Sequence, residues 1–204
     1  MSIALIGGAG EGLGAALGRR FSKTHEVVLS SRTRGEKADL RDEKQVIDLF
    51  ERIERRGAIE VAIFNAGAHF RGSIVDTPAA TFEDVWRLAC YAGFLFGREA
   101  ARRMVARGKG TILFTGATAS IRGSANFAAF AAAKGGLRQV AQSMARELGP
   151  KGIHVGHVVI DGRIGHGDNM LAPDAIADLY WQLHAQPRSA WTFEADLRPW
   201  SEKF

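Results

Sequence analysis

Residues 3–14 read Ile3-Ala4-Leu5-Ile6-Gly7-Gly8-Ala9-Gly10-Glu11-Gly12-Leu13-Gly14, and this stretch decides the fold of the chain. Its apolar beginning predicts a short strand, and Leu13, Leu17 and Phe21 then recur at the spacing of one helix face. Glycines between a strand and a helix let the backbone approach a pyrophosphate, whose negative charge is favoured by the helix N-terminus. The stretch therefore predicts a dinucleotide-binding turn at the start of an α/β domain.

The alternation of strand and helix continues along the chain. Further apolar strands are expected at residues 26–30, 61–64, 111–114, 154–160 and 191–197, and helices at residues 12–21, 43–53, 82–105, 127–148 and 173–184. Apolar strands separated by helices are typical of a parallel sheet that is covered on both faces. We therefore expect residues 1–204 to form a single domain, a Rossmann-type doubly wound parallel α/β sheet of about seven strands with helices on both faces.

Composition narrows the classes of function. Hydrophobic residues make up 46% of the chain and charged residues 24%, as in soluble globular proteins. The lone cysteine, Cys90, excludes an internal disulfide framework, and the apolar opening is too short for a signal peptide, so a cytoplasmic location is expected. The net charge of +5 is dispersed, and its densest cluster, Arg98, Arg102, Arg103 and Arg107, has the spacing of a solvated helix face. We expect no nucleic-acid, membrane or metal partner.

Four ordered motifs resemble those of the short-chain dehydrogenase/reductase family. They are the glycines Gly8, Gly12 and Gly14, the pair Asp39-Leu40, the motif Asn65-Ala66-Gly67 after a buried strand, and Lys134 in a long helix. The resemblance covers roughly residues 2–197 and implies an NAD(P)-binding oxidoreductase. It also implies a set of cofactor-binding residues, namely Gly8, Gly10, Gly12, Leu13, Gly14, Ser31, Arg32, Asp39, Leu40, Asn65, Ala66, Gly67, Lys134 and Ile164.

The end of the second strand favours NADP over NAD. Domains that prefer NAD place a carboxylate here to bind the ribose 2′-hydroxyl, whereas this chain has Ser31 and Arg32, which can donate to and pair with a 2′-phosphate. Glu11 argues against this preference, because several NADP-preferring relatives carry a basic residue in that loop. Only residues 33–38 separate Arg32 from Asp39, so we expect a trimmed sheet edge and a more exposed adenine end.

The catalytic residues of the family are largely replaced. Its tyrosine, serine and asparagine positions correspond here to Phe130, Ala117 and Cys90, and its lysine to Lys134. A phenyl ring and a methyl group carry no exchangeable proton, so acid catalysis worth about 10²–10⁴ in rate is lost at those positions. Lys134 can still bond the nicotinamide ribose.

Other residues can supply the proton. Thr118 follows the serine position and His69 follows the Asn65 motif, and further candidates are Tyr180 in the last helix and His166 and Asp168 in a lid segment, residues 163–172. The lid and the last helix, residues 161–190, are expected on the substrate side, where Ile164 can pack on the nicotinamide.

Two classes of function remain open. The first is an oxidoreductase that acts on a carbonyl, an alcohol or a related small molecule with a substitute proton donor. The second is a catalytically inactive NAD(P)-binding sensor or partner subunit. In either case we expect a homo-oligomer, a dimer or tetramer through the helices at residues 82–105 and 127–148.

Overall fold

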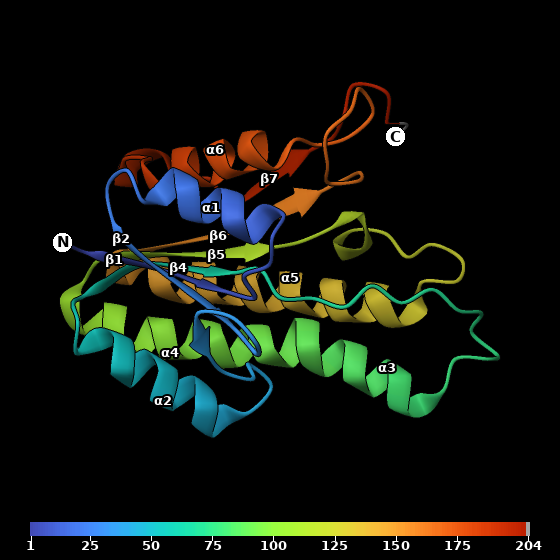
Figure 1. Ribbon diagram of the computed structural model, residues 1–204, viewed down its shortest axis with the longest axis horizontal. Coiled ribbons are helices and arrows are strands. Elements are labelled where there is room, and N and C mark those ends of the chain that lie inside the picture. The colour runs from blue at the N-terminus through green and yellow to red at the C-terminus, as the bar shows by residue number, and fades with distance from the viewer. Residues whose placement is uncertain (203–204) are drawn as a thin grey trace.

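Seven parallel strands form the centre of the computed structural model, which describes residues 1–202 (Figure 1). They are β1 (Ile3–Gly7), β2 (Glu26–Ser31), β3 (Glu36–Lys37), β4 (Ile59–Phe64), β5 (Gly110–Thr115), β6 (Ile153–Ile160) and β7 (Glu194–Leu197). Their order is β3-β2-β1-β4-β5-β6-β7, so the direction of winding reverses between β1 and β4. This confirms the doubly wound sheet that the sequence predicts.

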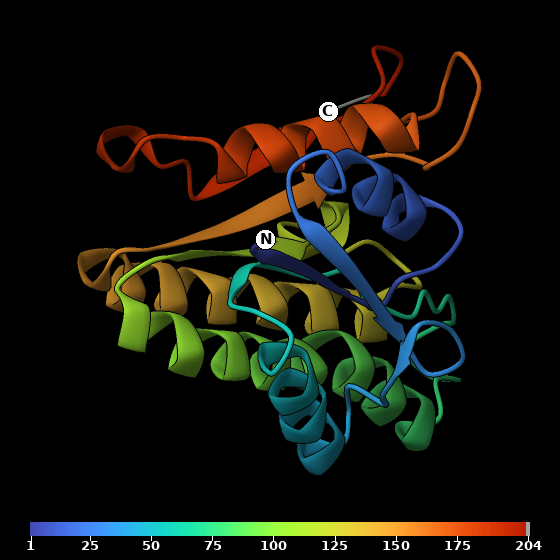
Figure 2. The ribbon, with the colours of Figure 1, turned by 60° about the vertical axis from the view of Figure 1, so that its left-hand side comes forward.

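Helices cover both faces of the sheet (Figures 1 and 2). One face carries α1 (Leu13–Phe21) and α6 (Pro173–His184), and the other carries α2 (Glu43–Glu54), α4 (Ala92–Arg107) and α5 (Ala128–Leu148), with α3 (Ala79–Trp86) beyond the end of the sheet. Each face has its own apolar core, one centred on Phe50, Phe96 and Phe114 and the other on Leu17 and Phe21. Within residues 1–202 no helix is both long and apolar enough to cross a bilayer.

The long helix expected at residues 82–105 is interrupted. It begins at Ala79 and ends at Arg107, and between α3 and α4 it contains a π-helical turn, Arg87–Tyr91. The extra residue of a π turn shifts the hydrogen-bond pattern without breaking the helix, so the apolar periodicity of the sequence does not disclose it. The helix ends where Gly108 adopts a left-handed conformation, φ 66°.

The trimmed edge of the sheet still forms a strand. Gly35 turns the chain with φ +64°, and a side chain there would collide with the Leu29 carbonyl. The two residues of β3 then pair with Ser30 and Ser31 of β2. Glu36 also pairs at 3.2 Å with Arg56, in the turn that follows α2, which ties the edge of the sheet to the segment between α2 and β4.

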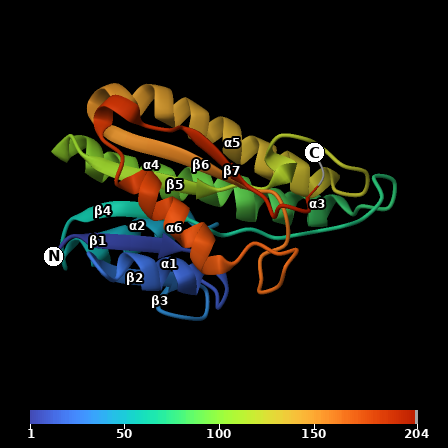
Figure 3. The same ribbon diagram turned by 90° about the horizontal axis from the view of Figure 1, so that it is seen from above.

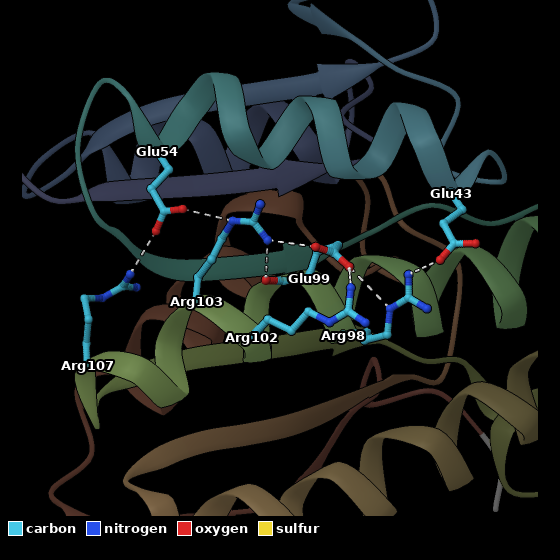
Figure 4. A network of polar contacts seen from close by, with 7 residues as sticks. All are labelled: Glu43, Glu54, Arg98, Glu99, Arg102, Arg103 and Arg107. Atoms are coloured by element: carbon cyan, nitrogen blue, oxygen red, sulfur yellow. Dashed lines mark hydrogen bonds and ion pairs between the residues drawn. The ribbon is translucent and has the colours of Figure 1, made fainter.

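The arginine cluster of α4 differs from a solvated helix face. Its centre is Glu99, only 2% exposed, which accepts hydrogen bonds from Arg102 at 2.7 Å and Arg103 at 2.8 Å (Figure 4). Glu54 of α2 lies 3.1 Å from Arg103 and 3.2 Å from Arg107. Arg98 pairs with both Glu99 and Glu43. Each of the four cations therefore pairs with at least one of three carboxylates, and Arg98, Arg103 and Arg107 link α4 to α2.

Candidate functional site

Two cavities adjoin at the carboxyl ends of the strands, the end of the sheet that carries the long loops (Figure 3). The first has a volume of about 720 Å³ and the second about 520 Å³. Asn65 and Gly67 line both, so the two cavities form one groove across the point where the winding of the sheet reverses. Volumes in this range suit a small molecule or cofactor.

The glycine loop between β1 and α1 forms one wall of the groove. Gly8 has φ +79°, and a Cβ there would collide with the backbone of Ala66. Its N–H and that of Ala9 donate to the Ser30 carbonyl at 2.9 and 3.0 Å, which holds the loop against β2. Gly14 lies outside the groove, and a Cβ there would approach Ala9 to 2.8 Å, so this glycine serves the packing of α1.

Gly10 and Gly12 have a different role from Gly8 and Gly14. A Cβ at either would meet no described atom within 4 Å, and Gly10 lines the second cavity while Gly12 and Leu13 line the first. The α1 helix begins after Gly12 without a side-chain cap and without an acidic residue in its first turn. Its N-terminus therefore presents open space and positive potential to the groove.

Asn65 ties the glycine loop to the centre of the sheet. Its Nδ2 donates to the Gly8 carbonyl at 3.2 Å, and its Oδ1 accepts from the Thr115 hydroxyl at 3.0 Å. The Thr115 hydroxyl also lies 2.7 Å from the Tyr180 hydroxyl. Since the Thr115 proton goes to Asn65, the Tyr180 hydroxyl is the donor of that last bond.

The second cavity contains the residues expected at the adenine end, Ser31, Arg32, Asp39, Leu40, Ala66, Gly8 and Gly10. The Ser31 hydroxyl accepts from Arg34 N at 2.8 Å and donates to Arg34 O at 3.0 Å, so its proton is already used by the turn. Glu11 forms a 2.6 Å ion pair with Arg34, which neutralises the carboxylate that argued against a phosphate. The Arg41 guanidinium beside Asp39 lowers the pKa of that carboxyl.

The first cavity contains Lys134 together with Phe130 and Ala117, two of the three replaced positions. Lys134 is 5% exposed and donates from Nζ to the Thr115 carbonyl at 2.7 Å. Burial lowers its pKa to about 8. Gly67 leaves room for this side chain, because a Cβ there would lie 3.2 Å from Nζ.

Cys90, at the third replaced position, does not line either cavity. It is buried in the π-helical turn, where burial raises the pKa of its thiol, and its Sγ lies 2.8 Å from the position of a Cβ on Gly136 of α5. The thiol therefore packs between helices and does not reach the groove.

The candidate proton donors fall into two groups. His69 and Thr118 line the first cavity with Ile164, and the Thr118 hydroxyl donates to the buried Asp161 carboxylate. His166 and Asp168 lie outside the two cavities. The segment that carries them is folded back on itself by a bond from Leu171 N to Arg163 O at 2.8 Å.

Tyr180 is excluded as a proton donor by its position. It is 0% exposed, packs in the core between α6 and the sheet, and has its hydroxyl committed to Thr115. Burial raises its pKa above the ordinary value. Among the candidate proton donors, Tyr180 is therefore the one that the structure places in the core and outside both cavities.

One buried polar pair near the first cavity, His157 and Glu194, was not predicted from the sequence. His157 of β6 is 0% exposed and lies 3.0 Å through Nδ1 from Glu194 of β7, which Arg138 also contacts at 2.6 Å. A Cβ on Gly116 would collide with the imidazole, so this pair supports the loop after β5. Burial lowers the pKa of His157 to about 4.

The fold and the groove together are those of an α/β nucleotide-binding protein, with the larger of the two cavities at one end of the groove. A family model described as short chain dehydrogenase matches residues 2–162. The chain therefore belongs to the short-chain dehydrogenase/reductase family, whose members are oxidoreductases.

Three similar proteins illustrate the range of this family. A short-chain dehydrogenase from Rhodopseudomonas palustris is 42% identical, with a TM-score of 0.91 over 98% of this chain and 99% of that one. A metagenomic short-chain oxidoreductase in complex with NADP is 25% identical, with a TM-score of 0.87 over 97% of each chain. A cyclic-di-GMP-binding biofilm dispersal mediator protein of Escherichia coli (strain K12) is 31% identical over 78% of this chain and 72% of its own length.

The share of a relative's length that this chain covers differs from one relative to another. It matches the Rhodopseudomonas palustris structure over nearly the whole of both chains. It spans about two thirds of the length of the first curated relatives that it matches, 67% and 66%.

Proposed function

We propose that this chain is an NADP(H)-preferring oxidoreductase that interconverts a carbonyl group and an alcohol on a small molecule. The observation that carries the proposal is the continuous groove. It runs from Arg32, past the glycine loop and Asn65, to Lys134 and the first cavity. A dinucleotide bound along this path would have its nicotinamide facing the larger cavity, where a substrate has room.

The residues present fit NADP. Gly10 and Gly12 leave the space that a pyrophosphate needs at the uncapped N-terminus of α1. At the adenine end, Arg32 is the residue for the 2′-phosphate, because Arg34 is engaged by Glu11 and the Ser31 proton by its own turn. Lys134 and Asn65 would hold the ribose end. When bound, the cofactor supplies the hydride for reduction or accepts it in oxidation.

This chain's own residues would orient the cofactor and the substrate. Phe130, Phe127 and Ile164 give part of the first cavity an apolar wall, against which an apolar part of the substrate would pack. The Lys134 ammonium donates to the Thr115 carbonyl and has further protons for ribose hydroxyls. Its charge also favours negative charge that develops on the substrate oxygen.

Turnover tests the proposal. NADPH oxidation by the purified protein should be followed against a panel of aldehydes, ketones and quinones, with NADH in parallel. We expect oxidation of NADPH that depends on one class of substrate and exceeds that of NADH. NADPH binding without turnover on any member of the panel would contradict the oxidoreductase proposal.

A second function is favoured by the two side chains without an exchangeable proton, Phe130 and Ala117. A protein that only binds the nucleotide, and signals its occupancy or supports a partner subunit, needs no acid at these positions. The name of the Escherichia coli relative describes nucleotide binding in place of turnover. Binding without turnover is the outcome that this alternative predicts.

We also propose that two copies associate through α4 and α5. Phe94 and Val105 of α4 are more than one third exposed, at 39% and 38%, on helices that otherwise pack into the core. Size-exclusion chromatography with light scattering tests this, and a monomer at all concentrations would contradict it.

We further propose residues 161–190 as the substrate side, of which Asp161, Gly162 and Ile164 reach the first cavity.

A further inference from the structure

We propose that His69 is the catalytic acid of this site and takes over the role of the tyrosine that Phe130 replaces. The inference deepens the proposed function and rests on it, because a proton donor is needed only if a carbonyl is reduced. The imidazole lies in the first cavity, with its ring centroid 5.2 Å from that of Phe130 and 5.3 Å from that of Phe127. A carbonyl held against Phe130 would therefore lie within reach of the imidazole.

The loop that carries His69 is held at several points. Its two neighbours, Ala68 and Phe70, pack against an apolar cluster of Val85, Ala89, Ala129 and Ala133. Two residues further on, Gly72 N donates to the Asn126 carbonyl at 2.9 Å, which joins this loop to the segment before α5. An acid works only from a fixed position, and these contacts supply one.

The loop is also fastened from the cavity side. The Arg71 guanidinium lies 6.0 Å from the centre of the Phe127 ring, on which the His69 ring also leans with an interplanar angle of 59°. His69 therefore has the two phenyl rings on one side and is exposed to solvent, so its ring nitrogens can exchange protons with water between turnovers.

Three other donors near the cavity are committed elsewhere. The Thr118 hydroxyl donates to Asp161, and an aliphatic hydroxyl is a far weaker acid than an imidazolium. The Tyr180 proton goes to Thr115 in the core. Lys134 donates to the Thr115 carbonyl deep in the groove, beside Gly67, where the ribose is expected.

Reduction of the carbonyl requires one hydride and one proton. Bound NADPH would supply the hydride to the carbonyl carbon, and the electron pair of the C=O π bond would move onto oxygen. That oxygen takes the proton of the His69 imidazolium and becomes the hydroxyl of the alcohol. NADP⁺ and the alcohol leave, and water reprotonates the neutral imidazole.

The test compares the wild-type chain with His69→Phe, a variant that keeps a ring against Phe127 and Phe130 but carries no proton. Lys23→Phe is the control, since it places the same ring at an exposed position outside both cavities and outside the proposed substrate side. We expect His69→Phe to lower kcat by about 10²–10⁴ with the affinity for NADPH unchanged, and the control to behave as wild type.

A rescue variant separates an acid from a merely structural ring. In the double variant His69→Phe with Phe130→Tyr, the phenol four residues before Lys134 restores the family's donor, and we expect kcat to recover about tenfold or more. Wild-type turnover that His69→Phe leaves intact would overturn this inference and leave the proposed function standing. A loss of turnover in Thr118→Val but not in His69→Phe would overturn it too. A wild-type chain that binds NADPH without turnover would refute the proposed function itself, and the role of His69 with it.

Discussion

Replacing Glu99 by glutamine is expected to destabilise the protein by about 3 kcal/mol, because it removes the charge at the centre of a buried network. The carboxylate is 2% exposed and accepts hydrogen bonds from Arg102 at 2.7 Å and Arg103 at 2.8 Å (Figure 4). Removing one partner of a buried ion pair costs about 3–5 kcal/mol, since the other charge remains buried. The lower end applies here, because Glu54 still lies 3.1 Å from Arg103.

Thermal and urea unfolding measure this loss. A domain of about 200 residues loses roughly 2–4 °C in Tm for each kcal/mol, so Glu99→Gln should lower Tm by about 6–12 °C. Asp48→Asn is the control, because it breaks an exposed ion pair with Lys44 on α2 and should leave Tm unchanged. A Tm within about 2 °C of wild type for Glu99→Gln would refute the reasoning, since it would mean that Arg103 needs no compensating charge.

Two further outcomes follow from the charges of the structure. Burial lowers the folded-state pKa of both His157 and His184 to about 4, against about 6.5 in the unfolded chain, so unfolding takes up protons between these values. The free energy of unfolding should therefore be highest above about pH 6.5 and fall by up to about 3 kcal/mol per histidine as the pH drops toward 4. Urea unfolding of the wild type and of His157→Gln at both ends of this range measures the effect. Equal acid sensitivity of the two proteins would contradict it. At the adenine end, Arg32→Ala should weaken NADPH binding roughly 10–100-fold and leave NADH binding unchanged, and an equal loss for both cofactors in parallel titrations would show that Arg32 does not contact the 2′-phosphate.

The apolar pattern was sufficient to predict most of the sheet and its helices, because buried elements need continuous or periodic apolar residues. It was insufficient where a feature depends on hydrogen bonds. The strand Glu36–Lys37 has only two polar residues and exists because Gly35 turns the chain back onto β2. The π-helical turn Arg87–Tyr91 likewise changes the bonding pattern more than the apolar spacing.

The burial of Tyr180 was predictable from the sequence. Ile176, Tyr180 and Leu183 have the spacing of one helix face, and the structure buries all three on the inner face of α6. The tyrosine became a candidate donor because its helix follows the lid segment. The helical spacing of the three residues predicts instead that it lies in the core.

Contacts between polar residues that lie far apart in the sequence could not be predicted from it. His157 belongs to a wholly buried strand, and its partner Glu194 lies on a neighbouring strand whose register no local pattern specifies. The central position of Glu99 is different, because Arg102 and Arg103 follow it at three and four residues, the spacing of helix neighbours. The prediction of a solvated helix face considered only the arginines and left out Glu99, the partner that they share.

The most direct test of the central claim is a fluorescence titration of the protein with NADPH. The wild-type chain should bind NADPH saturably and more tightly than NADH. Gly10→Leu should abolish binding with no change in Tm, because its side chain would enter open space in the groove. Gly149→Leu, at an equally open position far from the groove, should bind as wild type. Absence of NADPH binding by the wild-type chain, or unchanged binding by Gly10→Leu, would contradict the account.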